Sequence, residues 1–130
     1  MSSIAASLIV IGVVLQLYFV AAWAFGEEDA LDLHRGVGYL AWLLGIIVLV
    51  AGLVAYWGTW RQVTLSVALP VVVTIQIFFV GDIDDPGENV SGWIHGFHGG
   101  LAIFVFALAV AIGYRDMKTL GFHRRGEAAA

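Results

Sequence analysis

Four long apolar stretches alternate with short polar segments along this chain. The stretches lie at approximately residues 4–25, 34–57, 63–80 and 94–114. Each is close to the ~20 residues that an α-helix needs to cross a hydrocarbon core of about 30 Å. Pro70 falls inside the third stretch, where neighbouring helices of a membrane bundle compensate for its missing amide. The pattern predicts an all-α integral membrane protein, with four transmembrane helices in residues 1–118 and a cytoplasmic tail at 119–130.

Composition supports a membrane location and narrows the chemistry. Of the 130 residues, 61% are hydrophobic and 12% charged, whereas soluble domains carry about 45–50% and about 25%. The chain contains no cysteine, which excludes disulfides, thiolate metal sites, c-type haem attachment and cysteine nucleophiles. No nucleophile–base pair, phosphate loop or nucleic-acid patch is present in the sequence. An enzymatic function therefore has little support, and we expect no nucleic-acid partner.

Basic residues gather on one side of the predicted membrane. Arg61 lies between the second and third stretches. The remaining basic residues on this side follow the fourth stretch, namely Arg115, Lys118, Arg124 and Arg125. Only Arg35 lies on the opposite side, together with nearly all of the acidic residues. The positive-inside rule then predicts a multi-pass protein of the cytoplasmic membrane, with both termini in the cytoplasm and two acidic loops outside.

The two halves of the chain resemble each other. The segment "GVVLQLYFVA" aligns with "VVTIQIFFVG", so that Gln16 matches Gln76. The segment "HRGVGYLA" aligns with "HGFHGGLA", so that His34 matches His95. Each half is then one helical hairpin, and the two hairpins are parallel repeats about an axis along the membrane normal. We therefore expect an up-down-up-down four-helix bundle built from a duplicated hairpin, with the second and fourth helices as diagonal neighbours.

Histidines at the heads of the second and fourth helices are the leading site candidates. The repeat axis places His34 opposite a histidine of the second hairpin, at the same depth near the outer face. The alignment favours His95, whereas His98 lies deeper on regular helix and has small residues one turn below it. We favour His98 as the partner of His34 and keep His95 as a substitute or supporting residue. An ionisable residue at membrane depth is a functional candidate by default, although a histidine at the interface can also be without function.

Further polar and small residues surround these histidines. Gln16 and Gln76 fall inside the bilayer, where each amide either joins the two halves or hydrogen-bonds a ligating imidazole or bound group. A face of small residues runs below His34, comprising Gly38, Gly45 and Gly52. This face serves helix packing or makes room for a flat cofactor. Arg35 pairs either with nearby acids or with a carboxylate such as a haem propionate.

Two imidazoles that face each other across a helical bundle suit a haem iron. Bundles build cofactor sites from side chains on facing helices, and bis-imidazole ligation needs neutral rings on opposite sides of a flat, apolar macrocycle. All the candidate ligands lie near the predicted outer face, and none lies at the inner ends of the helices. We therefore expect one b-type haem near the outer face, with its propionates directed toward Arg35 and water.

The order of these motifs resembles a known family. Glutamine in the first helix, "HRGVGYL" opening the second, "QIFFVG" in the third and histidine heading the fourth resemble one four-helix half of haem A synthase. They also resemble small uncharacterised bacterial four-helix membrane proteins. The resemblance spans about residues 12–115 and implies His34 and His98 as axial ligands of a b-type haem. Haem A synthase has two such halves and outer-loop cysteines, which this chain lacks, so haem hydroxylation is not implied.

The leading expectation is a cytochrome-b-like protein for electron transfer or haem or redox sensing. It would work with a membrane or redox protein partner, and homo-oligomerisation is left open. One alternative is an outer-face site for Zn²⁺ or Cu²⁺, ions that suit imidazole with carboxylate ligands. The residues for that site would be His34, His95 and His98 with Asp29, Asp32, Asp82, Asp84 and Asp85. The other alternative is a cofactor-free accessory subunit of a larger membrane complex.

Overall fold

A computed structural model describes the backbone of residues 2–78 and 92–127 and the side chains up to residue 121. Four α-helices make up these residues: α1 (Ser2–Ala24), α2 (Ala30–Ala55), α3 (Trp60–Phe78) and α4 (Gly92–Glu127). All four are long and apolar enough to cross a membrane. The prediction of an all-α protein with four candidate membrane spans is thereby confirmed.

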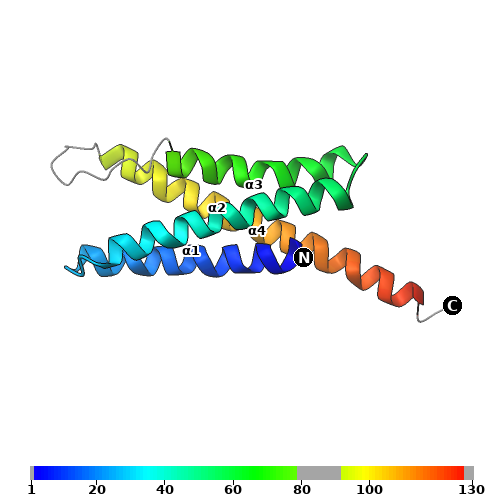
Figure 1. Cartoon of the computed structure of the whole chain (residues 1–130), viewed down its shortest axis with the longest axis horizontal. Helices are drawn as coiled ribbons and strands as arrows, with labels where there is room; N and C mark the ends of the chain where they lie inside the picture. The colour runs from blue at the N-terminus through cyan, green and yellow to red at the C-terminus, as the bar shows by residue number, and fades with distance from the viewer. Residues whose placement is uncertain (1, 79–91, 128–130) are drawn as a thin grey trace.

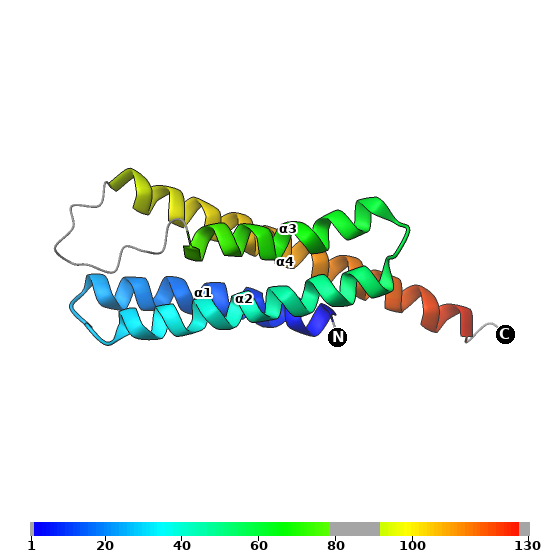
Figure 2. The same cartoon turned by 45° about the horizontal axis from the view of Figure 1, so that its top comes forward.

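The helices run back and forth along one long axis (Figures 1 and 2). Each helix packs against the next along the chain, and α4 closes the bundle against α1. The backbones of the diagonal pairs, α1 with α3 and α2 with α4, do not approach each other closely, so these helices meet only through side chains. This is the up-down-up-down order expected from the alternating pattern, and it places the heads of α2 and α4 on opposite sides of the interior.

Glycine ends the first hairpin helix. Gly26 has a φ of 104°, a left-handed conformation that glycine adopts without steric cost. The amide of Gly26 donates to the carbonyl of Trp23, and the amide of Glu27 donates to that of Ala22. This pair of bonds is a Schellman motif, which satisfies the last carbonyls of a helix and turns the chain. A five-residue connection therefore suffices to bring α2 back along α1.

Buried apolar side chains concentrate in one half of the bundle. The core includes Ile9, Val48, Leu69, Leu108 and Ile112. It lies toward the α2–α3 turn, and we call this half the arginine end after Arg115, which is described below. The positions of the buried residues in α1 and α4 show that the core occupies only one half of the bundle. In α1 no residue after Val13 is buried, and in α4 none of the described residues before Val105 is buried.

The opposite half, which contains His34 and His98, is called the histidine end. Ala30 is buried there, but the polar side chains that face inward are only half-buried, namely Gln16, His34, Gln76 and His98. The turn at Gly26 closes one side of it, and the described part of α3 reaches it at Phe78. The two ends of one bundle thus differ in how completely their interiors are filled.

The fourth helix is longer than its apolar run. We expected it to end near residue 114, but α4 continues to Glu127 and extends past the other helices (Figure 1). The segment after Tyr114 contains no proline and carries Arg, Met, Lys and Leu side chains that favour helix. Loss of hydrophobicity therefore marks the end of the apolar segment but not the end of the helix. The predicted tail at 119–130 is helical over its described part.

Candidate functional site: a histidine pair at one end of the bundle

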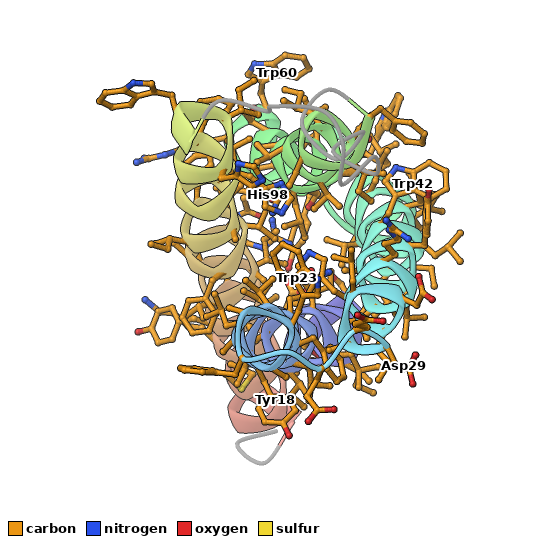
Figure 3. The ribbon with its side chains drawn as sticks, turned by 90° about the vertical axis from the view of Figure 1, so that its left-hand side faces the viewer. Tyr18, Trp23, Asp29, Trp42, Trp60 and His98 are labelled. Carbon is orange, nitrogen blue, oxygen red and sulfur yellow. The ribbon has the colours of Figure 1, made fainter. Side chains whose placement is uncertain are left out.

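The structure brings His34 and His98 together across the bundle interior. His34 lies in the second turn of α2, and His98 lies near the start of α4. Their ring centroids are 6.0 Å apart, and the ring planes are tilted by 48°. Figure 3 looks along the bundle from this end and shows His98 pointing into the space between the helices. Two diagonal helices therefore present their imidazoles to the same space.

The His34 ring is held by a backbone carbonyl. Its Nδ1 lies 3.2 Å from the carbonyl oxygen of Gln16 on α1. Because a carbonyl oxygen only accepts hydrogen bonds, the Nδ1–H of the ring must donate. That bond fixes the neutral tautomer whose Nε2 carries a free lone pair, the arrangement typical of metal-ligating histidines. In His34, Nδ1 is therefore used for the hydrogen bond to Gln16, and Nε2 is left with a lone pair that could bind a metal.

The His98 ring is held by a side-chain amide. Its Nε2 lies 3.5 Å from Nε2 of Gln76 on α3, at the long limit of a hydrogen bond. Its Nδ1 is buried and has no hydrogen-bond partner among the described residues. Buried polar atoms are normally satisfied, so this nitrogen marks an incomplete environment. A metal bound through Nε2 would take the place of the Gln76 amide at that atom.

The structure also separates the two candidate partners of His34. His95 lies one turn before His98 on α4, and its side chain is exposed. His98 is half-buried and faces His34. His98 therefore lies inside the bundle beside His34, as expected of the deeper histidine, and His95 lies on the bundle surface. Which histidine ligates a group is not tested by this arrangement and stays a prediction.

The two glutamines act differently, although the alignment paired them. Gln76 contacts His98 with its side-chain amide, whereas Gln16 contacts His34 with its main-chain carbonyl. The Gln16 amide lies over Gly38 instead, because a Cβ at Gly38 would come within 3.0 Å of its Nε2. Gly38 therefore makes room for this amide.

The other two glycines of the small-residue face, Gly45 and Gly52, serve helix packing. A Cβ at Gly45 would lie 3.4 Å from the backbone of Pro70, and a Cβ at Gly52 would overlap the side chain of Ser66. Both contacts are with α3, so these glycines let α2 and α3 approach closely. Of the two readings of this small-residue face, packing holds at Gly45 and Gly52. No open face therefore runs the length of α2.

Arg35 forms an ion pair on its own helix. Its Nη1 donates to Oδ1 of Asp32 at 3.0 Å, one turn away. Asp32 is largely exposed, and exposed pairs at this spacing contribute little to stability. Of the two roles considered for Arg35, the pair with a nearby acid is present. A role toward a propionate stays a prediction.

Sequence reasoning missed a second polar cluster at the arginine end. Arg115 on α4 donates from Nη1 to the carbonyl of Gln62 at 2.8 Å, and the same atom lies 3.3 Å from Oγ of Ser66. Its Nε and Nη2 both lie 2.8 Å from Oδ1 of Asp116. Tyr56 donates its hydroxyl to this same oxygen at 3.0 Å, and its ring lies 4.3 Å from the guanidinium carbon. The cluster joins α2, α3 and α4.

Burial distinguishes this cluster from a surface ion pair. The side chains of Arg115 and Asp116 are 12% and 7% exposed. The positive-inside rule treats Arg115 as a solvated charge, and for that reason the cluster was not expected. The available signal was Asp116, an acid within an otherwise basic segment at the end of an apolar run.

Among the described residues, the histidine pair is the candidate for ligand binding. Among residues 2–78 and 92–127, no three or more His, Cys, Asp or Glu side chains gather closely enough to hold a metal ion. Asp82, Asp84 and Asp85, considered for a zinc or copper site, lie outside the described residues. Neither protein-family models, nor curated proteins, nor solved structures match this chain.

Proposed function

We propose that this chain spans the cytoplasmic membrane and binds one b-type haem at the histidine end through His34 and His98. The observation that carries the proposal is the 6.0 Å separation of the two ring centroids. An imidazole nitrogen lies about 2 Å from a metal that it ligates. Two imidazoles on opposite sides of one metal therefore have ring centroids roughly 6 Å apart. The tilt between the rings is compatible, because each ring can rotate about its own bond to the metal.

The number of ligands favours haem over a bare metal ion. A structural or catalytic Zn²⁺ site takes three or four protein ligands. The described residues supply two imidazoles at this place. Haem iron receives four nitrogens from its own macrocycle, so two axial side chains complete it. The half-buried interior around His34 and His98 is also consistent with a bound apolar group.

The proposed role is electron transfer or redox sensing with a protein partner. A haem supplies one-electron chemistry when bound, and its axial ligands and their hydrogen bonds set its potential. The bond from Nδ1–H of His34 to the Gln16 carbonyl makes Nε2 a stronger base. Basic residues at the arginine end direct that end to the cytoplasm under the positive-inside rule. The histidine end would then exchange electrons with a partner on the outer side.

Absorption spectra of the detergent-purified chain test this proposal. Protein expressed with added haem precursor should show a Soret band that shifts on reduction, with sharp α and β bands, and about one haem per chain. The doubly substituted His34→Ala, His98→Ala chain should insert in the membrane and retain no haem. His95→Ala is the matched control, because it removes an exposed imidazole one turn away and should leave the spectrum unchanged.

Two results would overturn the haem assignment. One is a colourless wild-type chain, and the other is a double variant that keeps its haem. Metal analysis of the same samples separates the zinc or copper alternative, because stoichiometric Zn²⁺ or Cu²⁺ without porphyrin would replace haem by a metal-ion site. A chain with neither metal nor haem would support an accessory subunit.

A further inference from the structure

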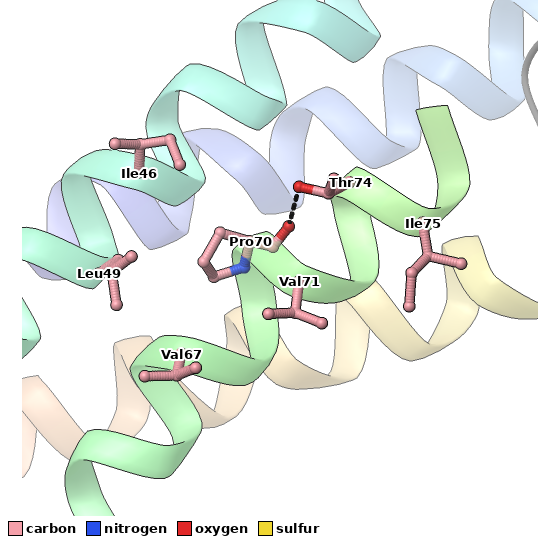
Figure 4. Close-up of a pocket in the computed structure, with 7 residues that line it drawn as sticks. All are labelled: Ile46, Leu49, Val67, Pro70, Val71, Thr74 and Ile75. Atoms are coloured by element: carbon pink, nitrogen blue, oxygen red, sulfur yellow. Dashed lines mark hydrogen bonds between the residues drawn. The ribbon is translucent and has the colours of Figure 1, made fainter. Parts of the chain in front are cut away.

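A groove on the outer surface of the bundle lies away from the histidines. It runs between α2 and α3 and has a volume of about 270 Å³. Its lining is almost wholly apolar: Ile46, Leu49, Val67, Pro70, Val71, Thr74 and Ile75 (Figure 4). The hydroxyl of Thr74 is turned into the protein, where it donates to the Pro70 carbonyl and accepts from Trp42. The groove therefore offers hydrocarbon contacts and no free polar group from Thr74.

A second depression, apolar except for Arg61 and Thr64, continues the same side of α3 toward the arginine end. It is lined by Trp60, Arg61, Thr64 and Leu65. Thr64, Val67 and Val71 follow one another at helical spacing, so they join the depression to the groove on one face of α3. Trp60 is 82% exposed and points away from the bundle (Figure 3). Tryptophan at such a position is typical of the headgroup level of a membrane.

Arg61 gives this depression its charge. Its side chain is exposed, and none of the described acidic side chains pairs with it. Arg115, by contrast, is enclosed by Asp116 and α3. A guanidinium binds phosphate through two parallel hydrogen bonds, and a basic residue at a helix end binds anionic headgroups. Arg61 is therefore a cation placed where a lipid phosphate would lie.

The distance between charge and groove matches one leaflet. Arg61 and Val71 are ten residues apart on α3, about 15 Å along a helix that rises about 1.5 Å per residue. Half of a hydrocarbon core of about 30 Å is also about 15 Å. A headgroup at Arg61 would thus place the end of its acyl chain in the groove around Val71.

We infer that the α2–α3 face binds one anionic phospholipid of the leaflet at the arginine end. Its phosphate lies against Arg61 beside Trp60, and an acyl chain occupies the groove at Pro70 and Val71. The inference rests on the membrane insertion proposed above and is independent of haem. Alkaline extraction of membranes tests the insertion by itself, because an inserted chain stays with the membrane fraction.

Native mass spectrometry of the full chain in detergent tests the lipid site. With added phosphatidylglycerol or phosphatidylcholine, the chain should retain one phosphatidylglycerol at least several-fold better than phosphatidylcholine. Arg61→Gln should abolish this preference. Lys118→Gln is the matched control, because it removes another exposed basic side chain on α4 and should keep the preference.

A second pair of variants tests the groove. Val71→Trp fills it and should reduce lipid retention, whereas Val110→Trp on α4 changes a similarly exposed valine and should not. Equal retention of the two lipids by the wild-type chain would overturn the proposal. So would equal losses in the Arg61→Gln and Lys118→Gln chains, or in the two tryptophan chains. Thermal midpoints of all variants, measured without lipid, confirm that each is folded.

Discussion

The two ends of this bundle each carry a polar cluster, but the clusters differ in how completely the surrounding side chains enclose them. At the arginine end, Oδ1 of Asp116 accepts two hydrogen bonds and forms the ion pair with Arg115, and the charges lie beside a filled core, although Oδ2 of Asp116 has no hydrogen-bond partner among the described residues. At the histidine end, His34 and His98 face each other where inward side chains are half-buried, and the Nδ1 atom of His98 has no partner. The contrast teaches that one bundle can separate the part that holds the helices together from the part open to a ligand.

Breaking the ion pair at the arginine end should have the largest effect on stability. Asp116→Ala leaves the Arg115 guanidinium buried with its acceptors on α3 alone. Removal of one partner from a buried pair typically costs 3–5 kcal/mol, and the remaining acceptors suggest about 3 kcal/mol. Unfolding of the detergent-solubilised chain in sodium dodecyl sulfate measures the change. The double change Arg115→Met, Asp116→Leu should cost clearly less, and equal losses would contradict a pairing role.

A second comparison uses glycines at the two ends. Gly52→Ala would bring a Cβ into the side chain of Ser66, which is fully buried, so overpacking should cost about 1–3 kcal/mol. Gly38→Ala meets only the movable end of the Gln16 side chain. A gain of up to about 1 kcal/mol in helix propensity offsets that contact, so stability should not fall.

The same unfolding assay measures both alanine variants. Adding Ser66→Gly to Gly52→Ala should restore most of the loss, because it removes the atoms in the way. A similar loss for both alanine substitutions would mean that the histidine end is packed as tightly as the arginine end.

The third comparison concerns the two glutamines in the haem-loaded chain. Gln76→Leu removes the amide that a metal bound through Nε2 of His98 would have to displace. Because a neutral hydrogen bond contributes about 0.5–1.5 kcal/mol, we expect a few-fold stronger retention of haem in competition with apomyoglobin. Gln16→Leu should leave retention unchanged, because His34 is held by the main-chain carbonyl at that position. Equal effects of the two substitutions would restore the symmetric role suggested by the alignment.

Hydropathy alone predicted four helices, because apolar length is a local property of the chain. The opposition of α2 and α4 followed from alternating direction, and it placed His34 across from a histidine of the second hairpin. What local patterns lack is the rotation and axial register of one helix against another. Those decide that His98 rather than His95 faces inward, and that Ser66 enters the space left by Gly52.

The arginine-end cluster shows that local sequence patterns also fail to predict which charged side chains are buried. Arg115 and Asp116 are adjacent in the sequence and close an apolar run, where both would ordinarily be solvated. Burial of the pair depends on α4 continuing as a helix past Tyr114 and on Tyr56 arriving from α2. The first condition follows from the helix-favouring residues after Tyr114, but the arrival of Tyr56 is not encoded near the two residues. The continuation of α4 matters because it keeps both side chains on a rigid backbone.

The one-sided core also determines where the folded chain opens. Segments with few buried contacts exchange their amide hydrogens through local opening, well below the free energy of global unfolding. Here those segments are the last turns of α1 and the first turns of α4, whereas the buried contacts of Ile9, Leu69 and Ile112 lie toward the other end. Fraying at the histidine end can therefore occur while the arginine end stays closed. Under the haem proposal, the planar group would enter between His34 and His98 after folding is complete, without dissolving the bundle.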